Sequence, residues 1–433
     1  MLSKLRKLVP DWVFHIYHWL RAVVAIIRYG YPARDLFVIG VTGTDGKTTT
    51  CHMIYSILKA AGLPASLIST TGAIITTDDN IPTGLHVTTP NPFQLQRLLK
   101  EARDTGSKYV VLEATSHGLA QNRVMGSNFQ IGVITNITHE HLDYHKTWEN
   151  YFLSKVKLLR RVKTSILNLE DPGSQKAISY ASGKLVTYGL TEKADIQATN
   201  IVREPTHTTF LASKLNTTIR SPFLGGYNVY NLLAAIAVGM ELGIEGKTIA
   251  KGLRNATPPP GRLQLMQEEP VTVYVDFAHT PNSLENVLAL LSDVAEQRLI
   301  AVFGCAGERD VQKRFPMGTS AGKHADITVI TAEDPRTENL DAIMDDVAEG
   351  VESEGGIFGE TYFRVHDRQA AIEFAIQELA QPGDIVVTCG KAHEQSLCFG
   401  TIEYPWDEFS AVKNALSGKK TNSGLPTAQL PTA

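Results

Sequence analysis

The sequence contains only four cysteines, and they lie far apart, at Cys51, Cys305, Cys389 and Cys398. No two of them have the Cys-x-x-Cys spacing that is typical of zinc knuckles and dithiol redox sites. A disulfide framework is excluded as well, because such frameworks stabilise short secreted chains that are dense in cysteine. We therefore expect a cytoplasmic protein whose cysteines stay reduced.

An excess of charge of one sign is also absent. The chain has 41 Lys and Arg residues against 45 Asp and Glu residues, which gives a formal net charge of −4. It lacks the strong basic excess of nucleic-acid-binding proteins, so we expect no nucleic-acid partner. Its 433 residues, 43% hydrophobic and 20% charged, are typical of a globular chain of two or three domains.

Long uninterrupted apolar runs are missing, although residues 12–29 come near to one. The histidines and arginines within this run make it too polar for a membrane-spanning helix. No small-residue cleavage site follows it, which argues against a signal peptide. On a helical wheel one face holds Val13, Ile16, Tyr17, Leu20, Val24 and Ile27, and another holds His18, Arg21, Ala25 and Arg28.

Residues 1–34 are thus predicted to form an N-terminal amphipathic helix, with Lys4, Arg6 and Lys7 ahead of its apolar part. Two interpretations of this helix stay open. It packs on the body of the protein, which we favour, or it lies on a membrane surface and gives the protein a peripheral contact through residues 12–29.

The most informative motif lies in residues 36–50, LFVIGVTGTDGKTTT. An apolar strand leads into Gly43-Thr44-Asp45-Gly46-Lys47-Thr48, and an amphipathic helix follows from Thr49 to Ala61. This order forms a phosphate cradle, because backbone N–H groups and a helix N-terminus turn towards the anion. Lys47 can reach terminal phosphates, and the Thr48 hydroxyl can bind Mg²⁺. The general P-loop has glycine five residues before Gly46, where this chain has Val41.

Polar groups follow three successive predicted strands. The strand 109–112 ends in Glu113, the strand 131–135 leads into a segment with His141, and the strand 164–168 ends in Asn168. Ligands bind at this edge of an open α/β sheet. Glu113 suits Mg²⁺ or a catalytic water, as acidic residues beside a P-loop do, and His141 can offer a nitrogen to a second metal ion.

Residues 184–220 alternate polar and apolar side chains, which predicts antiparallel strands that extend the sheet. Thr257-Pro258-Pro259-Pro260-Gly261 is a stiff linker, after which strands and helices alternate again. The predicted fold is α/β: a P-loop central domain with a mostly parallel sheet over residues 35–257, and a smaller Rossmann-like C-terminal α/β domain over residues 258–416. Residues 417–433 are predicted to be a disordered tail.

Several motifs in order resemble those of the Mur ligases, the ATP-dependent amino acid ligases of cell-wall peptide synthesis. The motifs are the glycine loop at 43–48, Glu113 with Ser116-His117-Gly118-Leu119 and Arg123, residues 140–145, and Asp276 with His279-Thr280-Pro281. Residues 333–336 and 390–394 are similar to motifs of the MurE type, which adds the third residue of the stem peptide. The similarity extends over roughly residues 36–416.

The resemblance implies a ligase, dependent on ATP and Mg²⁺, that forms an acyl phosphate on a peptidoglycan-precursor carboxylate and converts it to an amide. It implies ATP contacts at Gly43, Thr44, Asp45, Gly46, Lys47, Thr48, Thr49, Asn228, Asn231, Arg262, Asp276 and His279. The implied metal ligands are Thr48, Glu113, His141 and Lys155, and Lys155 matches the lysine that the family carbamylates. Lys47, Glu113, His141 and Lys155 are the implied catalytic residues.

The implied substrate contacts fall into two groups. Thr88, Thr89, Ser116, Gln121 and Arg123 match the residues for the UDP-sugar peptide. Arg309, Asp334, Arg336, Gly390 and Glu394 match those for the incoming amino acid, where arginine suits a carboxylate and Glu394 suits an ammonium group.

Three features depart from the family pattern. Asp334 stands where the diaminopimelate-adding enzymes have asparagine, so both a diaminopimelate-type and a lysine-type substrate stay open. Ala392 replaces a glycine. Only 35 residues precede the P-loop strand, so we expect the family's N-terminal UDP-binding domain to be lacking.

Two further functions are compatible with a P-loop chain of this length. A folylpolyglutamate-synthetase-like ligase would also lack the N-terminal domain, although residues 116–119 and 333–336 argue against it. A non-catalytic ATP-binding protein at the membrane surface would have no need for Lys47, Thr48, Glu113, His141 and Lys155 together.

Overall fold

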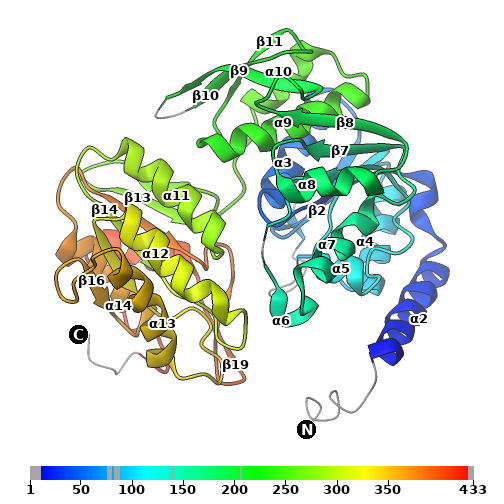
Figure 1. Cartoon of the computed structure of the whole chain (residues 1–433). Helices are drawn as coiled ribbons and strands as arrows, with labels where there is room; N and C mark the ends of the chain where they lie inside the picture. Colours follow the sequence, from blue (N-terminus) through cyan, green and yellow to red (C-terminus); the bar gives the residue numbers. More distant parts are fainter. Residues whose placement is uncertain (1–10, 76–79, 82–87, 139, 205–206, 428–433) are drawn as a thin grey trace. The chain divides into compact units, whose positions relative to one another are not determined.

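The computed structural model describes residues 11–75, 80–81, 88–138, 140–204 and 207–427. The chain forms two compact units, Met1–Thr257 and Pro258–Ala433, and each is described by itself (Figure 1). Both units combine a mostly parallel sheet with helices, so the predicted α/β fold is confirmed.

An 11-stranded sheet organises the first unit, in the order β11-β10-β9-β8-β7-β6-β1-β5-β2-β3-β4. The strands from β9 to β2 in this order pair in parallel, while β3, β4, β10 and β11 pair antiparallel at the two ends. The strands are β1 (Phe37–Thr42), β2 (Ala65–Ser69), β3 (Gly72–Ile75), β4 (Asn80–Ile81), β5 (Tyr109–Glu113), β6 (Phe129–Ile134), β7 (Thr164–Asn168), β8 (Lys184–Gly189), β9 (Ile196–Arg203), β10 (Thr208–Ala212) and β11 (Thr217–Ser221).

Helices cover both faces of this sheet. Side chains alternate between the two faces along each strand, and the buried strands have apolar side chains on both. On β1, Ile39 and Val41 join a core beneath α3 and α9, whereas Val38 joins a core beneath α4. The helices are α2 (Asp11–Tyr29), η1 (Pro32–Asp35), α3 (Lys47–Ala60), α4 (Pro92–Asp104), α5 (Ser116–Ala120), α6 (Leu142–His145), α7 (Trp148–Val156), η2 (Lys157–Leu159), α8 (Pro172–Ala177), η3 (Ile178–Tyr180), α9 (Gly226–Glu241) and α10 (Gly246–Arg254).

The predicted N-terminal helix is present as α2, which packs on α4. On its packed side Ala22 and Ala25 are buried and Ile26 contacts Gly126, while Leu20 and Ile27 are exposed. Packing on the protein is thus real, but it does not use the large apolar face. In the part of the chain that the structure describes, no helix has both the length and the apolarity to span a membrane.

The second unit contains a six-stranded sheet, in the order β12-β13-β17-β14-β15-β16, and a separate hairpin of β18 and β19. On β14, Ala301 and Phe303 face a core beneath α11, α12 and α13, while Ile300 and Val302 face a core beneath α14 and α15. The elements are β12 (Gln264–Gln267), β13 (Thr272–Asp276), α11 (Pro281–Val294), β14 (Leu299–Phe303), η4 (Val311–Lys313), α12 (Arg314–His324), β15 (Ile327–Ile330), α13 (Leu340–Ser353), β16 (Tyr362–Arg364), α14 (Arg368–Glu373), η5 (Phe374–Leu379), β17 (Ile385–Cys389), β18 (Ser396–Phe399), β19 (Ile402–Pro405) and α15 (Glu408–Leu416).

The end of the chain differs from the predicted disordered tail over residues 417–427. Leu425 is buried in the core beneath α14 and α15, and Thr421 donates a hydrogen bond to Glu373. Ser423 and Thr427 both donate to Asp367, the residue that caps α14. Polar composition suggested disorder, but these side chains serve as partners for acidic groups of the second unit. Residues 428–433 lie outside the described part.

Candidate active site

The glycine loop between β1 and α3 is shaped by two close approaches. Gly46 begins α3 with a φ of 78°, and a Cβ atom at this position would lie 2.3 Å from Oδ1 of Asn231 on α9. A Cβ atom at Gly43 would lie 1.8 Å from Oγ1 of Thr135, which donates a hydrogen bond to the carbonyl of Asp45. Only glycine fits at either position without a shift of its neighbours.

Side chains from α9 and from the segment that follows β6 hold the glycine loop in place. Nδ2 of Asn231 donates to Oδ1 of Asn228 at 2.9 Å, which fixes the asparagine that faces Gly46. Oδ1 of Asn136 accepts hydrogen bonds from the backbone N–H groups of Thr44 and Asp45. Lys47 donates to the carbonyl of Thr44 at 2.7 Å. The predicted residues Gly43, Thr44, Asp45, Gly46, Lys47 and Asn231 are therefore brought together.

The predicted metal ligands Thr48 and Glu113 touch each other. Oγ1 of Thr48 lies 3.0 Å from both carboxylate oxygens of Glu113, and the backbone and hydroxyl of Thr70 donate to Oε2 of Glu113 at 2.9 Å. A hydroxyl and a carboxylate are hard oxygen donors of the kind that Mg²⁺ prefers. Thr48 and Glu113 thus fit a magnesium ion held jointly with phosphate oxygens. Thr70 is a partner that the sequence analysis missed, because it follows β2 without a motif.

Lys155 is almost fully buried on α7, and its ammonium group contacts the carbonyl of Gly43. Burial, and then the positive charge of Lys47, lower the pKa of Lys155 well below that of an ordinary lysine. The hydroxyls of Thr44 and Tyr151 meet at 2.9 Å beside it. The structure thus places this amine against the glycine loop.

The surroundings of His141 are mainly aromatic. This residue has a φ of 56° and stands within a group of aromatic rings, with its ring centroid 4.8 Å from that of His117 and 6.3 Å from that of Tyr151. Its Nε2 is 3.5 Å from Glu140. Among the described residues, no three His, Cys, Asp or Glu side chains are grouped so that they can hold a metal ion. The role of His141 as a ligand therefore stays a prediction.

Three of the residues predicted for the peptide substrate, Thr89, Gln121 and Arg123, form one hydrogen-bonded group. Arg123 donates to the carbonyl of Thr89 at 3.0 Å and to Oε1 of Gln121 at 2.9 Å. Thr89 in turn binds the backbone N–H of Thr115, at the start of α5. Oγ of Ser116 is buried and has no hydrogen-bond partner in the described part of the chain, as expected of a group that awaits a ligand. Thr88 is half-buried next to Thr89.

In the second unit, the predicted nucleotide residues surround Phe277. The Arg262 guanidinium carbon lies 4.8 Å from the centre of the Phe277 ring, and the His279 ring is 4.5 Å away. Asp276 accepts hydrogen bonds from the backbone N–H groups of Leu263 and Ala278, and burial raises its pKa. This carboxylate fixes two turns of the backbone, so Asp276 has a structural role in addition to any contact with ATP.

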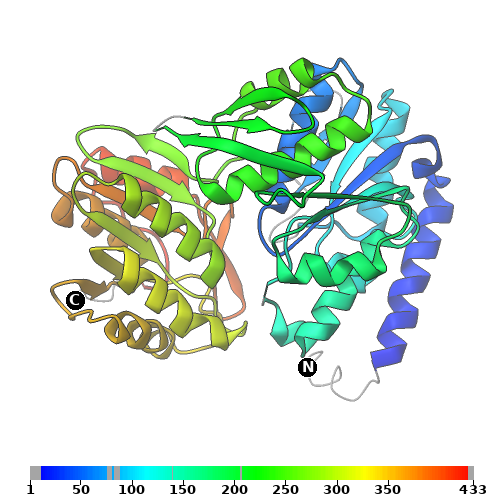
Figure 2. The same cartoon turned by 45° about the horizontal axis from the view of Figure 1, so that its top comes forward.

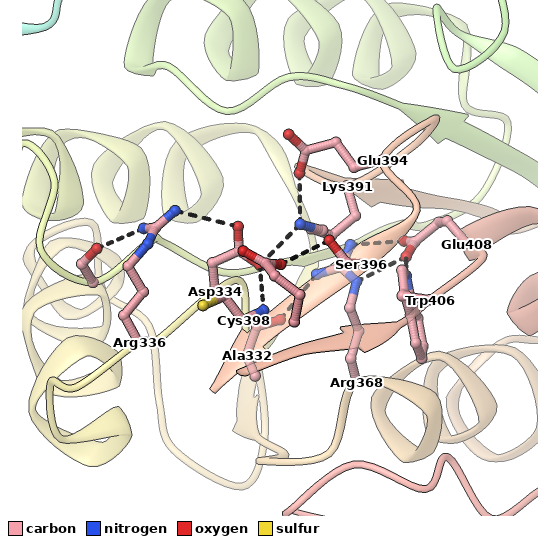
Figure 3. Close-up of polar contacts among 12 residues, drawn as sticks. Ala332, Asp334, Arg336, Arg368, Lys391, Glu394, Ser396, Cys398, Trp406 and Glu408 are labelled. Carbon is pink, nitrogen blue, oxygen red and sulfur yellow. Dashed lines mark hydrogen bonds and ion pairs between the residues drawn. The ribbon is translucent and has the colours of Figure 1, made fainter. Parts of the chain in front are cut away.

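The residues predicted for the amino acid meet around a lysine (Figure 3). The buried ammonium of Lys391 donates to Asp334 at 2.9 Å and to Glu394 at 2.5 Å. Burial alone would lower the pKa of Lys391, but Glu394 and Asp334 outweigh it and raise the pKa. Arg336 lies 3.6 Å from Asp334 and donates to the carbonyl of Gly307. Opposite charges are therefore balanced within this cluster.

Gly390 and Arg309 are the two further residues predicted for the amino acid. Gly390 has a φ of 104°, and a Cβ atom there would lie 2.3 Å from Oε2 of Glu333. Arg309 is exposed. Lys391 was missed by the sequence analysis as a residue of its own, although it lies within the motif 390–394. Its burial and its two partners become evident only when β15 and β17 are placed in one sheet.

A second buried ion pair contacts the backbone next to this cluster. Arg368 and Glu408 are fully buried and form two hydrogen bonds, of 2.8 and 2.7 Å. Arg368 also donates to the carbonyls of Ala332 and Cys389, which directly precede the site segments 333–336 and 390–394 (Figure 3). Nothing in the local sequence signals this role, because the partners are 21 to 40 residues apart.

Comparison with known proteins agrees with this arrangement. Residues 41–239 match the Mur ligase middle domain, and residues 261–392 match the Mur ligase, glutamate ligase domain. UDP-N-acetylmuramoyl-L-alanyl-D-glutamate–2,6-diaminopimelate ligase of Geobacillus thermodenitrificans is 38% identical over 411 residues, which are 92% of this chain and 82% of that protein. The protein of the same name from Thermosynechococcus vestitus is 39% identical over 406 residues, 91% of this chain and 79% of that protein.

Solved structures extend the comparison. A structure of UDP-N-acetylmuramoyl-L-alanyl-D-glutamate–2,6-diaminopimelate ligase superposes with a TM-score of 0.61 at 32% identity, covering 88% of this chain and 78% of that one. Folylpolyglutamate synthase of Mycobacterium tuberculosis superposes with a TM-score of 0.72 at 16% identity, covering 93% of this chain and 95% of that one. At that identity the second likeness shows a shared fold and no more.

Proposed function

The chain belongs to the Mur ligase family, and from this premise we propose that it joins a diamino acid to the peptide carboxylate of a peptidoglycan precursor, with UDP-N-acetylmuramoyl-L-alanyl-D-glutamate as the acceptor. The family makes it an ATP-dependent ligase of an acid and an amino acid. The names of its relatives support the acceptor and the added residue. The product would be an intermediate of cell wall biogenesis.

The observation that carries the proposal is the glycine loop with Thr48 backed by Glu113. Lys47 and the loop N–H groups would bind and orient the phosphates of ATP, and Thr48 and Glu113 would hold Mg²⁺ beside them. The bound ion would neutralise phosphate charge. Asn228, Asn231, Thr49, Arg262, Asp276 and His279 are the remaining proposed ATP contacts.

The test is phosphate release from ATP in the presence of the acceptor and an amino acid. We expect release only when both substrates are present, and at least a hundredfold less in Lys47→Ala, since a charge aimed at the transferred phosphoryl group is lost. Lys100→Ala is the matched control, because Lys100 is exposed on α4 and pairs with Asp104 on the same helix. Undiminished turnover in Lys47→Ala would refute the assignment.

We propose diaminopimelate as the preferred amino acid and lysine as its main competitor. In this chain the extra negative charge of Asp334 is bound by Lys391, so it does not by itself demand a cationic substrate group. Arg336 would bind the distal carboxylate that lysine lacks. A screen of both amino acids, with product mass as the readout, decides between them, and Arg336→Ala should reduce the preference for diaminopimelate.

Lys155 is proposed to carry a carbamate. A neutral amine reacts with CO₂, and burial beside Lys47 favours the neutral form. The carbamate would convert a cation into an anion that accepts a hydrogen bond or supports a second metal ion. Carbon-13 spectra in labelled bicarbonate should show a carbamate signal that Lys155→Arg abolishes.

Residues 12–29 are proposed to make a peripheral membrane contact. The exposed apolar face of α2 supports this, because this surface is not used for packing on α4. Sedimentation with liposomes of the full chain and of a chain without residues 1–30 tests the contact. Equal sedimentation of the two chains would refute it.

A further inference from the structure

We infer that α2 docks this protein on an anionic lipid surface, with the helix axis parallel to the surface and its large apolar side chains at the boundary between headgroups and acyl chains. The inference rests on the peripheral contact proposed above and adds the lipid chemistry and the face that is used. Figures 1 and 2 show α2, in blue, on the outside of the first unit.

The first argument is that α2 exposes large apolar side chains that an ordinary surface helix would bury. Ile27 is 74% exposed, Val24 51% and Leu20 48%, whereas the small residues Ala22 and Ala25 are buried against α4. A helix that served only for packing would turn its large apolar side chains inward. The full exposed set on this side is Ile16, Tyr17, Trp19, Leu20, Val24 and Ile27.

The second argument is charge complementarity. Residues 1–34 contain one acidic residue, Asp11, although acidic residues outnumber basic ones in the whole chain. The nearby acids Asp35 and Asp104 both pair with Arg103 of α4, and Asp35 also pairs with Arg34, which leaves five basic residues of the segment outside this pair. The six basic residues of this segment are Lys4, Arg6, Lys7, Arg21, Arg28 and Arg34. Such a segment is attracted to the negative surface of anionic lipids.

The third argument concerns how deeply α2 can enter a bilayer. Four positions of the run, His15, His18, Arg21 and Arg28, keep it from spanning a bilayer, and the structure contains no spanning helix among its described residues. Tyr17 and Trp19 are half exposed on the outer side, and such side chains prefer the boundary between headgroups and acyl chains. The helix therefore suits the surface of a membrane rather than its interior.

The position of α2 connects this surface to the candidate peptide site. A Cβ atom at Gly126 would lie 2.6 Å from Ile26, so the segment that follows Arg123 packs directly against the helix. The guanidinium of Arg21 lies 6.0 Å from the ring centre of Phe93 on α4. Docking through α2 would thus hold the Arg123 segment close to the lipid surface.

The experiment measures partitioning of the full chain onto vesicles of phosphatidylcholine alone and of phosphatidylcholine mixed with phosphatidylglycerol. We expect binding to the anionic vesicles, weakened by added salt, and about fivefold weaker binding in Arg28→Gln, the loss typical of one basic residue near such a surface. The double variant Leu20→Asn/Ile27→Asn should lose at least tenfold. Ile357→Asn/Ile402→Asn is the matched control, because both isoleucines are exposed in the second unit.

Each outcome has a distinct meaning. Equal binding to both vesicle types would refute the anionic selectivity, and no binding to either would also refute the peripheral contact. A dimer in solution that Leu20→Asn/Ile27→Asn dissociates would assign the face to a second copy of the chain and overturn the inference. Phosphate release measured without vesicles reports on the ligase proposal separately, since neither residue touches the glycine loop.

Discussion

Ala392 occupies a backbone position that favours glycine. Its φ of 40° lies in the left-handed region, which costs a residue with a Cβ atom about 1–2 kcal/mol relative to glycine. We predict that Ala392→Gly raises the free energy of unfolding by about 0.5–1 kcal/mol, because relief of strain exceeds the extra entropy of glycine in the unfolded chain. Denaturant unfolding measures the change.

A control separates strain from a general effect of glycine. Ala289 lies in the middle of α11, where glycine is about 1 kcal/mol less favourable than alanine. Ala289→Gly should therefore destabilise the chain while Ala392→Gly stabilises it. Destabilisation by both would show that the turn at 392 carries no relievable strain.

His393 predicts a dependence of stability on pH. Its ring is partly buried, with Nδ1 shielded from solvent, and burial, followed by the positive charge of Arg262, lowers its pKa to about 3. The unfolded chain binds a proton near pH 6.5 and the folded chain does not, so the free energy of unfolding falls as the pH drops from 6.5 towards 3. The contribution is about 1 kcal/mol for each pH unit in that window.

The comparison with His393→Gln isolates this contribution from other titrating groups. Between pH 7 and pH 5, chemical unfolding should show a larger loss of stability in the parent chain than in the variant. Equal losses in the two chains would mean that His393 titrates normally in the folded state.

At the scale of elements, the buried pair of Arg368 and Glu408 joins α14 and α15 to the ends of the sheet strands. Removal of one partner leaves an uncompensated buried charge, so Arg368→Met should lower the free energy of unfolding by about 3–5 kcal/mol. The double variant Arg368→Met/Glu408→Leu should recover part of this loss. Because Arg368 holds the carbonyls of Ala332 and Cys389, we also expect a raised KM for the amino acid.

The exposed pair of Lys176 and Glu149 provides the contrast. Their N···O distance is 2.6 Å, similar to that of the buried pair, but both side chains are almost half exposed. Lys176→Ala should cost less than about 1 kcal/mol, since water screens such pairs. A loss comparable with that of Arg368→Met would contradict the role assigned to burial.

The elements that the sequence predicted well are those with a continuous apolar run. β5 and β7 lie close to their predicted bounds, since central parallel strands are apolar on both faces. The short strands β12, β16 and β18 were missed, because three or four residues are too few to show an alternation of polar and apolar side chains. β8 was predicted to be antiparallel but pairs in parallel with β7. The alternation of polar and apolar side chains indicates that one face is exposed, but it does not indicate the direction of the neighbouring strand.

The site was predictable where a motif names its residues, as in the contact between Thr48 and Glu113. It was not predictable where a role depends on distant partners. Thr70, Lys391 and Arg368 acquire their roles only through hydrogen bonds to Glu113, Asp334 and Glu408. Such contacts are set by strand order, which a single sequence does not report.

At the scale of the whole molecule, the two units contain separate cores. Ile39 belongs to the core beneath α3 and α9 of the first unit, and Ile300 belongs to the core beneath α14 and α15 of the second. Each core is formed by residues of one unit alone. We predict two thermal transitions, because units with independent cores unfold as separate cooperative bodies.

Core variants identify the transitions. Ile39→Ala and Ile300→Ala each remove a fully buried side chain and should cost about 2–5 kcal/mol in the unit concerned. In calorimetry, Ile39→Ala should lower one transition temperature and Ile300→Ala the other. A single transition that shifts in both variants would show that the units unfold together, because coupling between them then exceeds the stability of the weaker unit.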